Sequence, residues 1–424
     1  MSRSPAGRAL IFLFGLLLSA LPTAPRALAQ EPLSALQSDL SHQLALAGPA
    51  DGAYVYDLTA KQSLFSERAT AMRSPASVEK LYTATAALAL MGPSARLATT
   101  VYGVGHMAAG GVWEGGLYLQ GGGDPTFGST AFIHSHYGGI GTSVSALVSQ
   151  LVRTAHITRV TGSIEGDESY FDSLRGEPSS DYEPDPFLEG TLSALAFNRG
   201  EVGSSKQSAR SPHAPALYAA HELALALTHA GVAIGGPSGA ATTPAGAVQL
   251  AQAPSPTIQQ LLDLTLPPSD NYFAETLLKD LGARYGGAGT TAAGATVVAH
   301  TIAQLLGIHP TVVDGSGLSE ADKTSPYQVT DLLVELAGTP LGPVLRDSMA
   351  VAGRTGTLEL RMRGTRAQSN CQGKTGTLTG VSNLVGYCQA ADGHTLAFAF
   401  FNDRIPTFAA HTFQDHMAIT LADY

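Results

Sequence analysis

The stretch SPASVEKLYTA at residues 74–84 opens the segment on which the interpretation of the whole chain depends. It contains the only Ser-x-x-Lys pattern of the sequence, formed by Ser77 and Lys80, and an alanine- and leucine-rich run follows it directly. Pro75 before this run and Gly92 after it predict a helix of about four turns. Because residues three apart share one face of a helix, the Ser77 hydroxyl and the Lys80 amine can meet.

This serine–lysine pair suits nucleophilic catalysis. A serine hydroxyl becomes a good nucleophile when a nearby base takes its proton, and a buried lysine with a lowered pKa can be that base. The N-terminus of the helix also directs backbone N–H groups at an oxyanion formed there. The alternative is a serine that caps the helix and an unrelated surface lysine one turn later. A lone Ser-x-x-Lys favours this alternative, so the rest of the chain must decide.

Residues 1–29 have the features of a secretion signal. Arg3 and Arg8 precede an apolar run at 9–21, and Ala27-Leu28-Ala29 offers small residues for cleavage. The run is too short for a transmembrane helix, and no second apolar span follows it. We therefore expect an exported protein, periplasmic or extracellular, with no transmembrane anchor.

The composition argues against two classes of function. The formal net charge is −10, and only six lysines are present. Such an acidic chain is a poor nucleic-acid binder, so we expect no nucleic-acid partner. The thirteen histidines include no His-x-x-x-His pair. A zinc peptidase is therefore not expected, and neither is a metal site or another cofactor.

The sequence predicts one domain that is interrupted by a second, inserted domain. Residues 30–96 and 255–424 combine helices with antiparallel strands, which predicts an α/β (α+β) fold. Residues 97–254 are rich in glycine and small polar residues, with short strand-like runs between turns, and predict an inserted mostly-β domain with some helix. Helices are expected at 32–47, 215–230, 272–281, 292–306, 326–337 and 408–421. Strands are expected at 53–58, 63–66, 372–378, 384–389 and 395–401, and in the insert at 99–104, 117–119 and 160–166.

Two further motifs follow the Ser77 helix. Ser269-Asp270-Asn271 lies in a loop between predicted helices, and Lys374-Thr375-Gly376-Thr377 lies on a predicted strand. Each has an ordinary explanation when taken alone: a helix-capping serine or aspartate, and an exposed strand lysine. The patterns Ser-x-x-Lys, Ser-x-Asn and Lys-Thr-Gly nevertheless occur once each, in the order found in penicillin-recognising serine enzymes.

A second segment imitates the third motif. Arg354-Thr355-Gly356-Thr357 has the same pattern with arginine in place of lysine. The residues after it, 359–363, are largely charged and lack the apolar strand pattern that follows Lys374. Lys374 is therefore the predicted third-motif cation.

The chemistry suggests a role for each polar group. Ser77 would attack an acyl carbonyl and Lys80 would accept its proton, while Ser269 and Lys374 would pass a proton to the leaving amine. Asn271 is suited to hold the amide of the substrate. The sequence leaves open which lysine or serine makes each proton transfer.

The strand of the third motif predicts a binding site for a carboxylate. Thr375 and Thr377 point to the same face of a strand, with Gly376 between them. Their hydroxyls can bond a substrate carboxylate that Lys374 attracts. The backbone N–H groups of Ser77 and Thr377 would form the oxyanion hole.

The two cysteines, Cys371 and Cys388, lie in one short region of an exported chain. A disulfide is expected there, the alternative being two reduced, buried thiols. In an antiparallel hairpin the partner numbers have a constant sum, and this pair centres the turn on Thr379-Gly380, a suitable tight-turn dipeptide. The bond would brace the outer end of the Lys374 strand.

The chain resembles class C penicillin-binding proteins of the D-alanyl-D-alanine carboxypeptidase/endopeptidase family over nearly the whole mature length. The matching stretches are PASVEKLYTA at 75–84, LYLQGGGDPT at 117–126, LSALAFNRG at 192–200, SDNYFAETLLKDLG at 269–282, DGSGLS at 314–319 and KTGTLTGVSNLVGY at 374–387.

This resemblance implies a split transpeptidase-like domain, with an antiparallel sheet flanked by helices and an all-helical part. It implies hydrolysis of the terminal D-Ala of peptidoglycan stem peptides, and many members also cut D-Ala–diaminopimelate cross-links. β-Lactam antibiotics would be covalent inhibitors. The interval from Ser77 to Ser269 is shorter than in members with two nested inserts, which argues against a full third domain. Glu320 stands where the family usually has arginine, so this corner is expected to differ.

Two other functions fit parts of the pattern. A serine β-lactamase uses the same three motifs, but the long insert and the stretches matched within it favour a peptidase. A non-catalytic wall-binding or scaffolding protein could keep the fold, but degenerate motifs would then be expected, and all three are intact.

Overall fold

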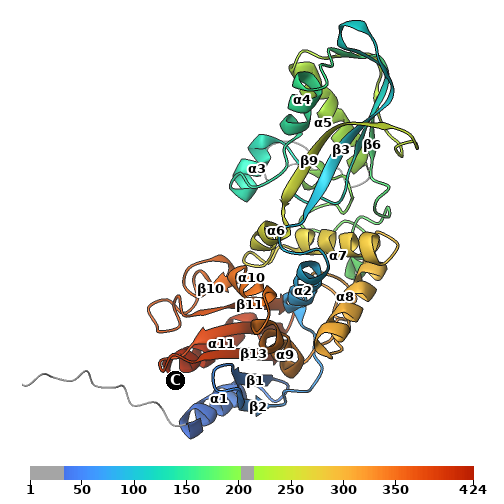
Figure 1. The fold of residues 1–424 in the computed structure, drawn as a ribbon. Helices are drawn as coiled ribbons and strands as arrows, with labels where there is room; N and C mark the ends of the chain where they lie inside the picture. Colours follow the sequence, from blue (N-terminus) through green and yellow to red (C-terminus); the bar gives the residue numbers. More distant parts are fainter. Residues whose placement is uncertain (1–32, 202–213) are drawn as a thin grey trace, which may run out of the picture.

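The computed structural model describes residues 33–201 and 214–424. The predicted secretion signal at 1–29 lies outside the described residues. A search of the described helices finds none with the length and apolar character needed to span a membrane. Figure 1 shows an elongated molecule with one sheet at each end. Helices α6 (Ile258–Thr265) and α7 (Asn271–Tyr285) lie between the two sheets.

One sheet joins the beginning of the described chain to its end. Within the described residues it has six strands in the order β10-β11-β12-β13-β1-β2, all antiparallel. The strands are β1 (Gly52–Asp57), β2 (Gln62–Glu67), β10 (Ala350–Val351), β11 (Cys371–Leu378), β12 (Val381–Gln389) and β13 (Thr395–Asp403). The pairing of β1 with β13 brings residues before the insert against residues near the C-terminus. This sheet, flanked by helices, confirms the predicted fold class.

Both faces of this sheet are covered. Helices α1 (Leu33–Ala47) and α11 (Thr407–Asp423) pack on one face, where Phe398 and Phe400 of β13 are buried. Ala399 and Phe401 of the same strand are buried in the cluster on the other face. Strand β13 is therefore apolar on both sides, which explains its nearly continuous apolar sequence.

The second face carries the helices that hold the first motif. These are α2 (Lys80–Leu90), α6, α7, α8 (Thr291–Leu306), α9 (Pro326–Ala337) and α10 (Leu341–Asp347). The expected four-turn helix is divided: Ser77 lies in a 3₁₀ turn, Ala76–Glu79, and Lys80 is the first residue of α2. Residues 80–88 of α2 are all buried because other elements surround the helix.

The second sheet is formed by the insert. Within the described residues it has seven strands, with β3 antiparallel to β4 and β9 and the remaining pairs parallel. The strands are β3 (Arg96–Met107), β4 (Val112–Gln120), β5 (Arg159–Val160), β6 (Ile164–Asp167), β7 (Ala233–Ile234), β8 (Ser238–Ala240) and β9 (Val248–Thr257).

Three helices accompany this sheet: α3 (Thr130–Tyr137), α4 (Val144–Arg153) and α5 (Pro215–His229). Of these, the sequence predicted only α5. Parallel strands need crossover connections, and α4 and α5 provide them between β4 and β5 and between β6 and β7. Helix α3 is short and a glycine-rich segment follows it, which concealed it, whereas the apolar stripe of α4 at Val144, Leu147, Val148 and Leu151 was an available signal.

Strands β11 and β12 form the hairpin that carries the third motif. Their register pairs Cys371 with Cys388 and Lys374 with Val385, the pairing given by the constant-sum argument. Gly380 in the turn has a φ of 74°, a left-handed conformation that glycine adopts without strain. A disulfide joins the two cysteines beside the outer end of β11.

We expect the purified, unreduced protein to contain no free thiol. Replacing both cysteines by alanine should lower the free energy of unfolding by about 2–4 kcal/mol, because the unfolded chain regains the entropy that the closed loop removes. Thiol titration under denaturing conditions and urea unfolding of the two proteins measure these effects. Two titratable thiols in the unreduced protein would contradict the expectation.

Candidate active site

The loop before Ser77 is held against the sheet. The Asn383 side-chain amide on β12 donates to the backbone carbonyls of Ser74, at 3.0 Å, and Pro75, at 2.8 Å. Gly376 on β11 lies so close to this loop that any side chain there would collide with the Pro75 carbonyl. The absence of a side chain at Gly376 therefore lets the third motif lie directly beside the backbone N–H of Ser77.

Lys80 lies under Ser77 and is almost completely buried, with 1% of its surface exposed. Its Nζ is 2.9 Å from Ser77 Oγ, 2.6 Å from Asn271 Oδ1 and 2.7 Å from the backbone carbonyl of Ser316. Burial lowers the pKa of Lys80 from 10.5 to about 8, because the charged amine loses its hydration. A neutral amine beside a serine hydroxyl can act as a general base.

The second motif sits at the N-terminus of α7. Asp270 caps the helix by accepting from the Phe273 N–H at 3.0 Å, and Asn271 is the first helical residue. Ser269 has a φ of 67°, a left-handed conformation that is uncommon for serine and typical of functional sites. The structure thus brings Asn271 to Lys80.

Lys374 on β11 is fully buried and completes a second serine–lysine pair. Its Nζ donates to Ser269 Oγ at 2.7 Å and to the Thr375 carbonyl at 2.8 Å. Burial lowers the pKa of Lys374 well below its usual value, and the positive charge of Lys80 lowers it further. The two amines are close enough that a charge on Lys80 makes the neutral form of Lys374 more favourable.

The threonines of the third motif differ in exposure. Thr375 is 7% exposed, and its hydroxyl donates to Thr357 Oγ1 at 2.8 Å. Thr377 is exposed and pairs with Ser382 of β12. The strand therefore carries one threonine whose hydroxyl is already bonded and one threonine that is exposed.

The segment that imitates the third motif lies next to the site without supplying its cation. Arg354 is exposed, and its Nε donates to Ser369 Oγ at 2.8 Å. Thr357 contacts the third motif through Thr375, and its N–H donates to the Pro267 carbonyl at 2.9 Å. This segment was excluded by its sequence pattern as the source of the third-motif cation. Its repeat of Thr-Gly-Thr was the available signal that Thr357 belongs near the site.

The DGSGLS turn at 314–319 supplies the third partner of Lys80, the carbonyl of Ser316. Asp314 accepts from the N–H groups of Gly317, at 2.6 Å, and Ser319, at 2.7 Å, and so closes the turn. Gly317 has a φ of 80° and contacts the Ala76 carbonyl so closely that no side chain fits. Glu320, which follows the turn, is exposed.

Arg199 of the insert contacts the second motif. The sequence did not predict a role for this residue. Its guanidinium forms a buried ion pair with Asp270 and donates to the Tyr137 hydroxyl at 2.7 Å. It also lies over the rings of Tyr272 and Phe273, 5.2 and 5.1 Å from their centres. This arginine therefore links the insert to the residue between Ser269 and Asn271.

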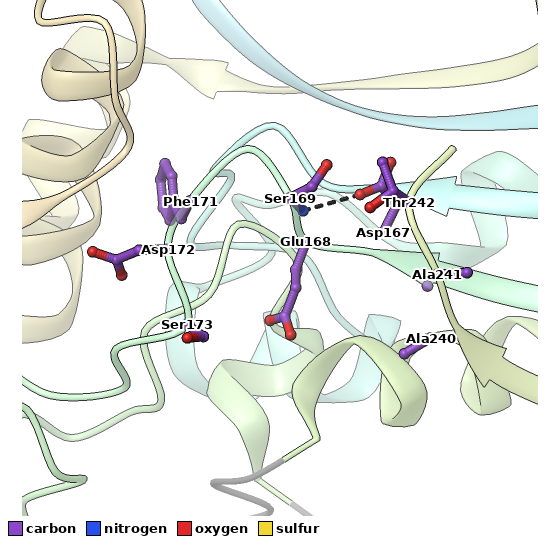
Figure 2. A pocket seen from close by; sticks show the side chains of 10 residues that line it. Asp167, Glu168, Ser169, Phe171, Asp172, Ser173, Ala240, Ala241 and Thr242 are labelled. Atoms are coloured by element: carbon purple, nitrogen blue, oxygen red, sulfur yellow. Dashed lines mark hydrogen bonds between the residues drawn. The ribbon is translucent and has the colours of Figure 1, made fainter. Parts of the chain in front are cut away.

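A separate hollow lies at the end of β6 in the insert (Figure 2). Asp167 there accepts from the Ser169 N–H at 2.9 Å, and Glu168 pairs with Arg175 at 2.6 Å. Because these carboxylates already have partners and no motif residue lines the hollow, we assign it no role. Over residues 33–201 and 214–424, no group of three or more His, Cys, Asp and Glu side chains is arranged to hold a metal ion.

The fold and this arrangement define a penicillin-recognising serine enzyme, the class that works through an acyl-enzyme. The chain belongs to the D-Ala-D-Ala carboxypeptidase 3 (S13) family, whose model matches residues 33–187 and 199–424. It is a serine-type D-Ala-D-Ala carboxypeptidase, as the sequence predicted.

Relatives of the chain agree with this family. It is 29% identical to a D-alanyl-D-alanine carboxypeptidase of Actinomadura sp. (strain R39), over 92% of this chain and 85% of that protein. It is 29% identical to a carboxypeptidase of Mycobacterium tuberculosis, over 78% of this chain and 71% of that protein. The solved structure of penicillin-binding protein 4 from Haemophilus influenzae has the same fold. Its TM-score is 0.75 at 20% identity, over 91% of this chain and 99% of that one.

Exchanging the two candidate cations for alanine tests the assignment of the third motif. Lys374→Ala should abolish acylation by a fluorescent penicillin, because the substrate carboxylate loses its charge partner and Ser269 loses its hydrogen-bond donor. Arg354→Ala should leave the acylation rate within a few-fold, as exposed substitutions usually do. The opposite pattern would mean that the wrong segment has been assigned.

The lowered pKa of Lys80 predicts a pH dependence of acylation. If the neutral amine is the base, the rate constant should rise about tenfold per pH unit below pH 8 and level off above it. Stopped-flow acylation between pH 6 and 9 measures this profile, whose apparent pKa belongs to the coupled pair of lysines. A rate constant that is flat over this range would rule out the titrating amine as the base.

Proposed function

We propose that the protein removes the terminal D-alanine from peptidoglycan stem peptides through an acyl-enzyme on Ser77. The observation that carries this proposal is the contact of 2.9 Å between Ser77 Oγ and the buried Nζ of Lys80. We further propose that the same site cuts D-Ala–diaminopimelate cross-links, because the resemblance to carboxypeptidase/endopeptidases covers the whole site.

In the proposed acylation, Lys80 takes the proton of Ser77 as Oγ attacks the carbonyl of the penultimate D-Ala. The backbone N–H groups of Ser77 and Thr377 stabilise the oxyanion. The C–N bond then breaks, and the leaving amine takes a proton through Ser269, whose hydroxyl is bonded to Lys374. Water then hydrolyses the ester and restores the serine.

The substrate carboxylate is proposed to bind at the third motif. Thr375, Gly376 and Thr377 form the strand edge beside Ser77, and Lys374 lies beneath it. A carboxylate placed there would favour the charged form of Lys374, whose pKa burial otherwise lowers. Asn271 would hold the amide of the substrate through its side chain.

β-Lactams are proposed to acylate Ser77 as covalent inhibitors. Penicillin-binding protein 4 of Haemophilus influenzae has been solved in complex with a β-lactam. A predatory endopeptidase of Bdellovibrio bacteriovorus has been solved with penicillin G as its acyl group. The ring-opened amine stays attached to the acyl group, so it cannot leave to admit water. A lasting acyl-enzyme would distinguish the proposed enzyme from a β-lactamase, which would hydrolyse the ester rapidly and turn the compound over.

Two further features of the sequence remain proposals. We propose that the protein acts outside the cytoplasm at the cell wall, which the predicted signal at 1–29 supports. We also propose that residues 30–96 and 255–424 form the catalytic domain and residues 97–254 the insert. The positions of β3, which begins at Arg96, and β9, which ends at Thr257, support these limits.

Ser77→Ala should lose both penicillin labelling and D-alanine release while remaining folded, because removing one hydroxyl leaves no large cavity. The loss of the nucleophile typically costs several orders of magnitude in rate. Mass spectrometry of digests of a pentapeptide ending in D-Ala-D-Ala and of cross-linked muropeptides measures each activity.

The outcomes of this experiment separate the alternatives. Labelling of the alanine variant would exclude Ser77 as the nucleophile. Rapid release of the label by the wild-type protein would favour a β-lactamase. Wild-type protein that takes up no label and frees no D-alanine would favour the scaffolding protein. Uncleaved muropeptides alongside D-alanine release would restrict the activity to carboxypeptidase.

A further inference from the structure

Glu275 on α7 is a fully buried carboxyl that the mechanism above does not use. It lies four residues after Asn271, so both side chains project from the same face of the helix. Its Oε1 accepts from two successive backbone N–H groups, those of Gly315 at 2.9 Å and Ser316 at 2.8 Å. Glu275 therefore binds the DGSGLS turn at Ser316, the residue whose carbonyl contacts Lys80.

The Ser316 carbonyl is held from several directions. Asp314 Oδ1 accepts from the Ser316 N–H at 3.1 Å, within the turn itself. Thr83 on α2 donates to the neighbouring Gly315 carbonyl at 3.0 Å. Because Glu275 takes both N–H groups from the α7 side, it sets the position of the turn relative to the helix that carries Asn271.

The hydrogen bonds of a neutral Lys80 amine show why this position matters. A neutral amine has two N–H donors and one lone pair. The two acceptors without a proton of their own are Asn271 Oδ1, at 2.6 Å, and the Ser316 carbonyl, at 2.7 Å. When these take both donors, the lone pair is left for the third neighbour, the Ser77 hydroxyl at 2.9 Å.

We propose that Glu275 is a positioning residue for acylation: by holding Ser316 it directs the lone pair of Lys80 at Ser77 Oγ. Helix α7 then positions both acceptors of the Lys80 amine. Asn271 lies on the helix itself, and the Ser316 carbonyl is positioned by Glu275 of the same helix. This inference rests on the proposed role of Lys80 as the base.

The surroundings of Glu275 indicate which substitution preserves its role. Burial and, to a smaller extent, the nearby Asp314 carboxylate raise the pKa of Glu275 to about 8. The raised pKa favours the uncharged acid, which glutamine imitates. Charged and titratable groups surround the Glu275–Lys80 region from several elements: Glu79, Glu177, Glu189, Asp270, Lys279, Asp314 and Lys374.

The experiment compares Glu275→Leu with Glu275→Gln in the full exported protein. Leucine has a similar shape but accepts no hydrogen bond, whereas glutamine keeps an acceptor for both N–H groups. Asp280→Asn is the matched control, because Asp280 lies on the same helix, is equally buried and does not contact the turn. Stopped-flow acylation by fluorescent penicillin at pH 7–9 gives the rate constant and the fraction of protein labelled.

We expect the acylation rate constant of Glu275→Leu to fall about 100-fold at every pH, the cost of a small misplacement of a catalytic group. The labelled fraction should stay unchanged. Glu275→Gln and Asp280→Asn should acylate within a few-fold of wild type. Should the leucine variant fail to fold, Thr83→Val tests the same turn from α2, and its rate constant should fall about tenfold through the lost hydrogen bond.

Several outcomes would overturn the inference. The first two are a wild-type acylation rate constant in Glu275→Leu and a loss in that variant that affects only the labelled fraction. The third is an acylation rate constant of Glu275→Gln no higher than that of Glu275→Leu. If Glu275→Leu does not fold, a wild-type acylation rate constant in Thr83→Val is the contradicting outcome. Labelling of Ser77→Ala would instead overturn the proposed nucleophile, so the two failures are distinguishable.

Discussion

The site depends on keeping two lysine amines out of water within reach of two serine hydroxyls. Lys80 and Lys374 are both almost fully buried, and burial lowers the pKa of each. A buried amine without partners would destabilise the fold, so each is bonded to a serine hydroxyl and a backbone carbonyl. The lowered pKa values make each amine easier to deprotonate, and the neutral form can accept a proton from a serine hydroxyl.

Close backbone approach is what allows this burial. Gly376 brings β11 against the loop before Ser77, and Gly317 brings the DGSGLS turn against Ala76. A side chain at either glycine would push apart the elements that enclose the amines. The insert contributes through Arg199, whose ion pair with Asp270 holds the residue between Ser269 and Asn271. The six-stranded sheet, the helical layer and the insert thus each fix one side of the site.

The sequence predicts those catalytic residues that lie in short, unusual patterns. Ser77 and Lys80 stand three residues apart, and the motifs that begin at Ser269 and Lys374 each occur once. The sequence did not predict site residues that have a common side chain and that reach the site only because distant parts of the chain fold together. Thr357 lies in the repeated Thr-Gly-Thr, and Arg199 and Glu275 lie in the family-matching stretches at 192–200 and 269–282, but nothing local assigns these side chains a contact in the site. Helix α3 was missed because its eight residues carry little periodicity, whereas α4 was missed although Val144, Leu147, Val148 and Leu151 form a helical stripe.

Residue type, spacing and strand register were enough to predict the enzyme class, the antiparallel sheet around Lys374 and the pairing of Cys371 with Cys388. The surroundings of Lys80 follow from the folded structure alone. Its partners come from residues 77, 271 and 316, which the chain separates widely and the fold brings together. A lowered pKa is a property of burial and of neighbouring charge, and neither can be read from the order of residues along the chain.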